Sequence, residues 1–96
     1  MMVEKELSVV ISAFNEEKNV DNLFKKLTNA LNKLKINWEI VFINNHSTDR
    51  TGELAKQISR RDKRIRVIQR YNREDKDLGS SLREGFKNCT GKYIII

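Results

Sequence analysis

Four short apolar runs alternate along the chain with three stretches in which apolar residues recur at helical spacing. Each run is almost continuously apolar, which is typical of strands buried on both faces of a parallel sheet. The runs are residues 7–11, 38–43, 65–68 and 93–96. The helical stretches are residues 20–34, 51–59 and 78–88. The pattern therefore predicts the order β-α-β-α-β-α-β.

The first helical stretch carries the clearest apolar stripe, and polar residues before the first two helices are candidate caps. The stripe consists of Val20, Leu23, Phe24, Leu27, Ala30, Leu31 and Leu34. It predicts a helix that packs along one side on a sheet. One interpretation of Asn15, Glu16 and Glu17 is that they cap this helix, a role that can coexist with ligand contact. Ser47 or Asp49 is expected to cap the second helix.

Helices that alternate with near-continuous apolar strands predict an α/β fold, a Rossmann-like three-layer parallel sheet. Right-handed crossovers favour the spatial order 3-2-1-4, with the first and fourth strands side by side. Open α/β sheets bind ligands outside the carboxyl ends of the strands, where the strand order changes direction. The loops at residues 12–17 and 44–51 are therefore expected to border one crevice. Ser81 and Gly85 predict close packing of the third helix on this sheet.

Composition limits the class of protein. Ninety-six residues make one small domain at most, and 39% apolar with 33% charged residues fits a folded, soluble chain. No apolar run approaches the ~18 residues of a membrane span, and no secretory signal opens the chain. A single cysteine, Cys89, fits a reducing cytosol, so we expect a cytoplasmic protein. The net charge of +6 favours anionic partners in general.

Two polar segments need separate interpretation. Residues 60–66 (RRDKRIR) form a basic stretch, which we interpret first as a surface that simply faces water. Attraction to anionic lipid on the cytoplasmic membrane face comes second. Nucleic acid is not expected, because no aromatic residues are interleaved for base stacking. Residues 70–77 (RYNREDKD) predict a mobile surface loop.

Three segments resemble the motifs of a known family. Residues 9–20 (VVISAFNEEKNV) resemble the opening V-V-I-P-x-Y-N-E-E-x-N-I of inverting family-2 glycosyltransferases, which have a GT-A fold. Residues 39–51 (EIVFINNHSTDRT) resemble their E-I-I-V-V-D-D-G-S-T-D-G-T. Residues 77–86 (DLGSSLREGF) and 90–94 (TGKYI) are similar to G-K/L-G-A-A-L-x-x-G and A-T-G-D-Y-I. Within the family, the resemblance is nearest to the polyprenyl-phosphate sugar synthases, which include dolichyl-phosphate mannose enzymes.

The resemblance implies a binding site for a nucleotide-sugar donor. The residues that it assigns to the nucleotide are Ser12, Ala13, Phe14, Glu16, Asn44, Asn45 and Leu78. Ser12 and Ala13 would line the nucleoside with backbone groups, and Phe14 would sit against it. Glu16 would approach the base or ribose. Asn45, with Asn44 beside it, stands where the family usually has an aspartate that reads the base edge, and Leu78 occupies a position that is often basic.

The chain also departs from the family pattern. Ser12 replaces a proline, while His46 and Asp77 each replace a glycine, so His46 must adopt a glycine-like backbone conformation. The family's Asp-x-Asp segment, which holds Mg²⁺ or Mn²⁺, would begin after Ile96. The resemblance therefore implies that residues 1–96 are the amino-terminal part of a transferase, without its metal ligands or catalytic residues and inactive alone. The alternative is a non-catalytic module that binds nucleotide or self-associates as a homo-oligomer through an open sheet edge.

The amide at Asn45 suggests which base is bound. A carboxylate only accepts hydrogen bonds, so it suits guanine, whose edge offers two donors. An asparagine amide offers a donor and an acceptor, which complements the uracil edge. We therefore expect Asn45 to favour UDP over GDP.

Overall fold

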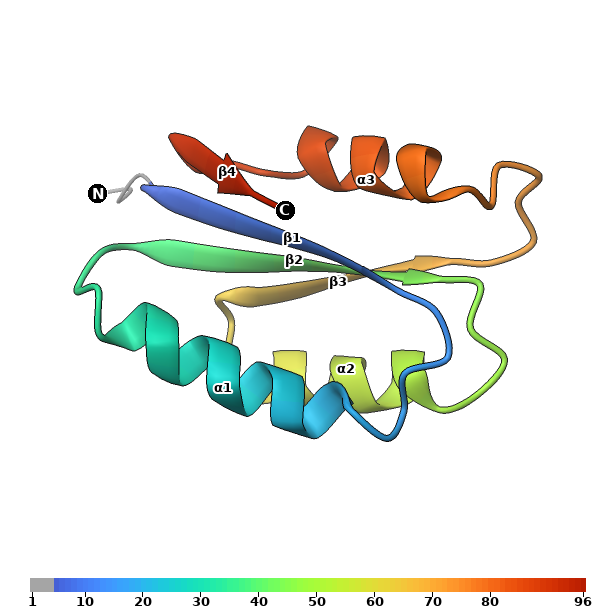
Figure 1. The fold of residues 1–96 in the computed structure, drawn as a ribbon, viewed down its shortest axis with the longest axis horizontal. Coiled ribbons are helices and arrows are strands. Elements are labelled where there is room, and N and C mark those ends of the chain that lie inside the picture. Colours follow the sequence, from blue (N-terminus) through green and yellow to red (C-terminus); the bar gives the residue numbers. More distant parts are fainter. Residues whose placement is uncertain (1–4) are drawn as a thin grey trace.

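The computed structural model describes residues 5–96 and shows strands and helices in strict alternation (Figure 1). The strands are β1 (Leu7–Ala13), β2 (Trp38–Asn45), β3 (Ile65–Arg70) and β4 (Tyr93–Ile95). The helices are α1 (Val20–Asn32), α2 (Thr51–Arg61) and α3 (Leu78–Lys87). Neighbouring strands are all parallel, in the order β3-β2-β1-β4. The predicted α/β class and sheet order are therefore confirmed.

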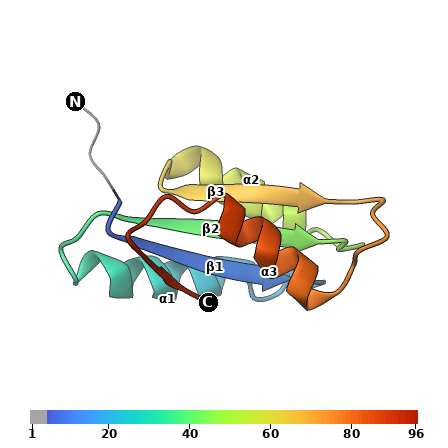
Figure 2. The same ribbon diagram turned by 90° about the horizontal axis from the view of Figure 1, so that it is seen from above.

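Helices cover both faces of the sheet and so form three layers (Figures 1 and 2). α1 and α2 lie on one face, where alternate strand residues such as Trp38, Ile40 and Phe42 form the larger apolar core. α3 lies on the opposite face, above a smaller core that is centred on Val41 and Ile43. The strands contribute to both cores because successive side chains point to opposite faces. Within residues 5–96, no helix is long and apolar enough to cross a bilayer.

α1 buries a narrower stripe than the sequence predicts. The buried members of the stripe are Val20, Phe24 and Leu31. Leu23, Ala30 and Leu34 are exposed, so their predicted burial is wrong. Leu34 lies beyond the last helical residue, Asn32. A helix that rests on one face of a sheet buries only one side. Leu23 directly precedes the buried Phe24, and Ala30 directly precedes the buried Leu31, so both side chains point away from the buried side.

α3 approaches the sheet closely, as its small residues predict. Ser81 and Gly85 are both buried against the sheet. A Cβ atom at Gly85 would lie 2.6 Å from Val10 Cγ1 and 2.6 Å from Ile43 Cδ1. The Ser81 and Ser12 hydroxyls lie 2.6 Å apart and share a hydrogen bond. Close packing of the third helix is therefore confirmed.

A buried carboxylate, Glu39, holds the turn that leads into β4. Its Oε2 accepts hydrogen bonds from Ser8 Oγ at 2.5 Å and from the Thr90 N–H at 2.7 Å. Its Oε1 accepts one from Arg66 Nη2 at 2.8 Å. The next N–H, at Gly91, donates to Ser8 Oγ at 2.9 Å. Since a Cβ at Gly91 would lie 2.7 Å from Ser8 N, only glycine fits this turn.

Burial raises the pKa of Glu39, but the hydrogen bonds from Ser8 and Thr90 and the charge of Arg66 outweigh it and hold the pKa below 4.5. Glu39 therefore contributes stability above about pH 4.5, and this contribution is lost as the pH falls through the lower folded pKa.

We expect Glu39→Gln to lower the free energy of unfolding by about 2 kcal/mol at neutral pH, because one amide N–H₂ replaces an acceptor oxygen. Urea unfolding between neutral pH and pH 3 will measure this. The gap between the two proteins should narrow on acidification, since only the wild type loses the Glu39 charge. A gap that does not depend on pH would contradict the role of the ionised carboxylate.

Candidate functional site

Two polar loops meet at the carboxyl edge of the sheet (Figure 1). One follows β1 and contains Phe14 and Asn15, and the other follows β2 and begins at His46. β1 and β2 are adjacent and parallel, with Ala13 paired to Asn44, so their loops leave the sheet side by side. This is the edge at which open α/β sheets bind ligands.

Asn15 forms the centre of a set of hydrogen bonds that we call the loop staple, made between residues 15–17 and residues 47–51. The Asn15 N–H donates to Ser47 Oγ at 2.9 Å. In return, Asn15 Oδ1 accepts from the Thr48 N–H at 2.8 Å and from the Asp49 N–H at 3.4 Å. Asn15 has a φ of 51°, a left-handed conformation that asparagine tolerates better than most residues.

Glu16 and Glu17 complete the loop staple. The Glu16 N–H donates to Thr51 Oγ1 at 2.8 Å, and the Glu17 N–H donates to Asp49 Oδ2 at 3.2 Å. The Glu17 carboxylate accepts from the Arg50 N–H at 3.0 Å. Burial raises the pKa of Asp49, but hydrogen bonds from Thr51 and Glu17 outweigh it and lower that pKa overall. Each loop therefore satisfies backbone N–H groups of the other.

These bonds explain why the predicted cap of α1 is wrong. Asn15 and Glu17 bond to the second loop and not to the start of α1, whose N-cap is Asn19, without a capping bond from its side chain. Arg50 is the N-cap of α2, also without a side-chain cap. Ser47 bonds to Asn15 instead, whereas Asp49 accepts from the Thr51 N–H at 2.9 Å and so satisfies the first N–H of α2, as predicted, although Arg50 is the N-cap residue.

The residues that the resemblance assigns to the first loop lie close together but face different sides of the sheet. Phe14 projects from the loop tip and is 57% exposed. Ser12, Ala13 and Glu16 line a pocket of about 270 Å³, whose apolar wall is formed by residues of α1 and β2. The Ser12 hydroxyl points to the opposite face of the sheet, the α3 side, where it shares a hydrogen bond with the Ser81 hydroxyl.

Asn44 and Asn45 point to opposite faces of the sheet. Asn44 is fully buried, and its Nδ2 donates to Gln69 Oε1 at 2.7 Å and to the Tyr71 hydroxyl at 2.5 Å. It is therefore part of the packing between β2, β3 and α2. Gly52 is required beside it, since a Cβ there would overlap the Asn44 amide. Asn45 lies on the α3 side, next to the loop that leads into α3.

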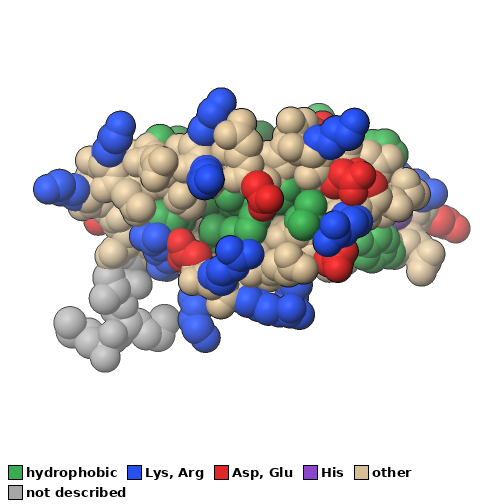
Figure 3. Space-filling model, turned by 90° about the horizontal axis from the view of Figure 1, so that it is seen from below, with side chains coloured by type: hydrophobic (Ala, Val, Ile, Leu, Met, Phe, Trp, Pro, Cys, Tyr) green, Lys and Arg blue, Asp and Glu red, His purple; other side chains and the backbone are tan. Residues whose placement is uncertain are grey.

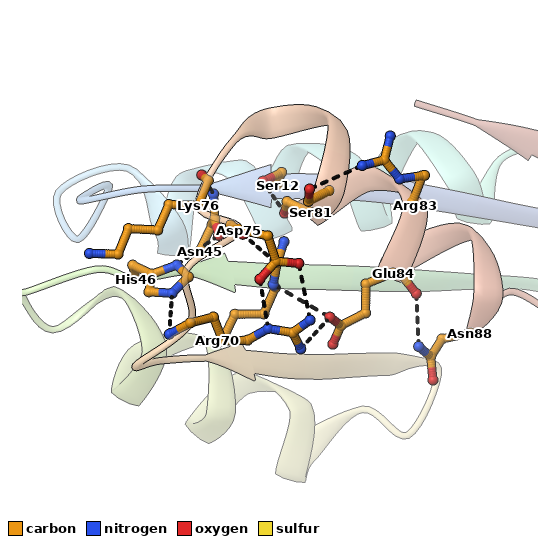
Figure 4. A network of polar contacts seen from close by, with 12 residues as sticks. Ser12, Asn45, His46, Arg70, Asp75, Lys76, Ser81, Arg83, Glu84 and Asn88 are labelled. Carbon is orange, nitrogen blue, oxygen red and sulfur yellow. Dashed lines mark hydrogen bonds and ion pairs between the residues drawn. The ribbon is translucent and has the colours of Figure 1, made fainter.

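The orientation of the Asn45 amide is set by its neighbours (Figure 4). Its Nδ2 donates to the Lys76 carbonyl at 2.8 Å, and its Oδ1 lies 2.9 Å from His46 Nδ1. His46 Nε2 accepts from the Arg73 N–H at 3.2 Å, so Nδ1 carries the proton and donates to Asn45. One N–H and one lone pair of the amide have no partner within residues 5–96, although the residue is buried, with 9% of its surface exposed. His46 adopts a φ of 63°, as expected for a residue in place of glycine.

Arg70 anchors the loop between β3 and α3, a role that sequence reasoning missed. Its side chain is fully buried and pairs with Asp75 at 3.0 Å and with Glu84 at 3.4 Å (Figure 4). Arg73 pairs with the same two carboxylates and lowers the pKa of Asp75. The expectation of a surface loop over residues 70–77 is therefore wrong for Arg70, the last residue of β3.

The start of α3 belongs to the same edge. Asp77 is its N-cap and accepts a hydrogen bond from the Ser80 N–H at 2.8 Å, which lowers the pKa of Asp77. Leu78, the first helical residue, is 62% exposed. Within residues 5–96, no cluster of three or more His, Cys, Asp or Glu side chains could hold a metal ion.

We expect Asn15→Ala to loosen the second loop, because it removes the acceptor for two N–H groups. The amides of Thr48 and Asp49 should exchange about tenfold faster in native-state hydrogen exchange. The amide of Val10 in β1 should keep its protection. Asn22→Ala, an exposed substitution on α1, is the matched control. Unchanged exchange at Thr48 in Asn15→Ala would show that the loop does not depend on Asn15.

Comparisons with known proteins agree with this architecture. The family model for glycosyl transferase family 2 matches residues 8–96. The dolichol-phosphate mannosyltransferase of Pyrococcus furiosus is 37% identical over 94% of the chain and 24% of its own length. Glycosyltransferase GlyA of Streptococcus pneumoniae is 32% identical over 98% of the chain and 13% of its own length.

A solved mannosyltransferase from Pyrobaculum calidifontis, in complex with GDP-Man and Mn²⁺, has a similar fold. The TM-score is 0.72 at 16% identity, over 96% of this chain and 26% of that one. The chain thus spans about a quarter or less of the length of these relatives. It belongs to glycosyl transferase family 2.

Proposed function

We propose that the chain is the donor-binding part of a glycosyltransferase that transfers a sugar from a nucleoside diphosphate to an acceptor. The loop staple carries this proposal. It holds the two loops rigidly at the edge where parallel sheets bind ligands, with Phe14 exposed at the tip. An exposed aromatic side chain on a rigid loop suits stacking against a nucleoside. The names of the related proteins support the same activity.

The proposed contacts follow from the side of the sheet on which each residue lies. Ala13 and Glu16 line the pocket on the α1 side and would approach the ribose or base. Asn45 lies on the α3 side and would contact the base edge. Leu78, exposed at the start of α3, would border the donor there. Asn44, which is buried with its amide hydrogens already donated, would support the site from within.

The proposal also covers the sugar acceptor and the metal ion of the complete enzyme. A polyprenyl phosphate acceptor is suggested by the relative named dolichol-phosphate mannosyltransferase. Mg²⁺ or Mn²⁺ is suggested by the neighbour solved with Mn²⁺. Residues 5–96 offer no cluster of ligands for such an ion. We therefore propose that the 96-residue chain binds the donor without transferring the sugar.

The free groups of Asn45 support a preference for uridine. After bonding to Lys76 and His46, the amide retains one N–H and one lone pair. Uracil presents one acceptor and one donor, whereas the guanine edge presents two adjacent donors. The neighbour of similar fold is in complex with GDP-Man and gives no support to a uridine preference, which rests on the Asn45 amide alone.

We expect isothermal titration calorimetry of the chain to show tighter binding of UDP than of GDP, and Asn45→Asp to reverse the order. The ratio of the UDP affinity to the GDP affinity should change by about tenfold, which corresponds to the free energy of one or two hydrogen bonds. Asn29→Asp, the same chemical change on the exposed side of α1, is the control. Tighter GDP binding by the wild type would end the base preference, whereas binding of neither nucleotide would end the proposed function.

The open sheet edge supports a second candidate, a self-associating module. Within residues 5–96, β4 pairs only with β1, and its residues Tyr93, Ile94 and Ile95 are 65%, 42% and 53% exposed. An apolar edge strand with unpaired backbone groups can pair with a second copy.

Light scattering coupled to size-exclusion chromatography distinguishes the two candidates. Pairing through β4 would give a dimer that Ile95→Lys converts to a monomer. Lys87→Ile, which adds apolar surface on α3 instead, should leave the mass unchanged. A wild-type monomer at all concentrations would eliminate the self-associating module.

A further inference from the structure

The charge of the chain is distributed unevenly among the layers. Residues 20–35 and 51–64, which form α1, α2 and the turns that follow them, contain nine Lys and Arg and three Asp and Glu. Their excess of six equals the net charge of the whole chain, +6. The other residues carry equal numbers of acidic and basic side chains. One layer of the molecule therefore carries all of the excess.

Most of these basic side chains have no partner. Eight are exposed and make no ion pair or hydrogen bond through the side chain within residues 5–96. They are Lys25, Lys26, Lys33, Lys35, Lys56, Arg60, Arg61 and Lys63. The ninth, Arg64, pairs with Asp62 and lies over the Trp38 ring. In the rest of the described chain, Arg66, Arg70 and Arg73 are paired with carboxylates, whereas the exposed Lys18, Lys76, Lys87 and Lys92 also make no ion pair within residues 5–96. We call the eight side chains the basic layer.

A groove with apolar and charged residues in its lining runs between the two helices of this layer. It has a volume of about 410 Å³ and a mixed lining: Phe24, Ile58 and Ile65 are apolar, Lys25 and Arg61 are basic, and Asp21, Asp62 and Thr28 complete it. Seen from this side, apolar side chains lie in the centre, with Lys and Arg side chains and a smaller number of Asp and Glu side chains around them (Figure 3). The same layer exposes Leu23 and Leu34, which are 37% and 54% exposed. Cations around exposed apolar groups are typical of surfaces that lie on a lipid interface.

We propose that the basic layer is a docking surface for an anionic lipid bilayer. Clusters of four to eight Lys and Arg attract acidic headgroups, and the basic layer has eight. Six of them are lysines, whose flexible point charges suit a mobile array of headgroups better than a fixed phosphate. This inference does not depend on the proposed donor site, which lies at the edge of the sheet.

Nucleic acid is the competing partner, and the distribution of aromatic residues disfavours it. The exposed aromatic side chains are Phe14, Tyr71, Phe86 and Tyr93, and all four lie outside the basic layer. Single strands bind on aromatic platforms flanked by positive charge, and this layer offers only the charge.

Co-sedimentation with vesicles tests the proposal. The chain should bind vesicles of phosphatidylcholine with phosphatidylglycerol and should not bind phosphatidylcholine alone. Raising NaCl from about 0.05 M to about 0.5 M should release it, because screening shortens the reach of exposed charges. The double variant Lys25→Gln/Arg61→Gln should lose at least about tenfold in affinity. Lys87→Gln/Lys92→Gln, with the same change of charge outside the layer, should lose less than about twofold.

A second pair of exposed residues, Lys26→Gln/Lys63→Gln, repeats the test away from the groove, and circular dichroism verifies that each variant is folded. Three results would overturn the proposal: equal losses in the test and control variants, equal binding to neutral vesicles, or no vesicle binding. Binding of a nucleic-acid oligomer without vesicle binding, lost in Lys25→Gln/Arg61→Gln, would assign the layer to nucleic acid instead.

Discussion

The parallel pairing of β1 with β2 is the constraint on which the rest of the structure depends. It brings the ends of two strands that are 31 residues apart into register, Ala13 against Asn44. The loops that follow must then leave the sheet together, and each supplies the hydrogen-bond acceptors that the other needs. The left-handed conformations of Asn15 and His46 are held by these contacts. The candidate site is therefore organised before any ligand arrives, which lowers the entropy cost of binding.

The two faces of the sheet are held in different ways. The α1 and α2 face is an apolar core, in which Phe24 and Phe42 lie with ring centroids 5.2 Å apart. The α3 face has only a small apolar core, and polar side chains are buried in it at Glu39, Asn45 and Arg70. Buried polar groups tolerate few arrangements, because each needs its own partner. This face therefore fixes the positions of β4 and of the loop before α3, rather than simply adding stability.

The sequence predicts the fold well because strand and helix periodicities differ and crossovers have one hand. It predicts the site less well. Asn15, Glu16 and Glu17 precede a helix, so local chemistry favours capping, but contacts to a loop more than 30 positions away prevail. Such contacts leave no periodic signal. The burial of Arg70 was missed for the same reason, since its partners Asp75 and Glu84 stand on the next loop and helix.

The direction of the helices separates the proposed donor edge from the basic layer. α1 and α2 begin at the loop staple, so the positive ends of their dipoles point to the edge where a diphosphate would lie. Their negative ends lie at the opposite edge, where Lys33, Arg60 and Arg61 complement them. At the proposed donor edge Arg73 is paired with Asp75, whereas Lys18 and Lys76 are exposed without an ion pair within residues 5–96. The basic layer lies away from this edge, so the proposed second, extended anionic partner would account for its position.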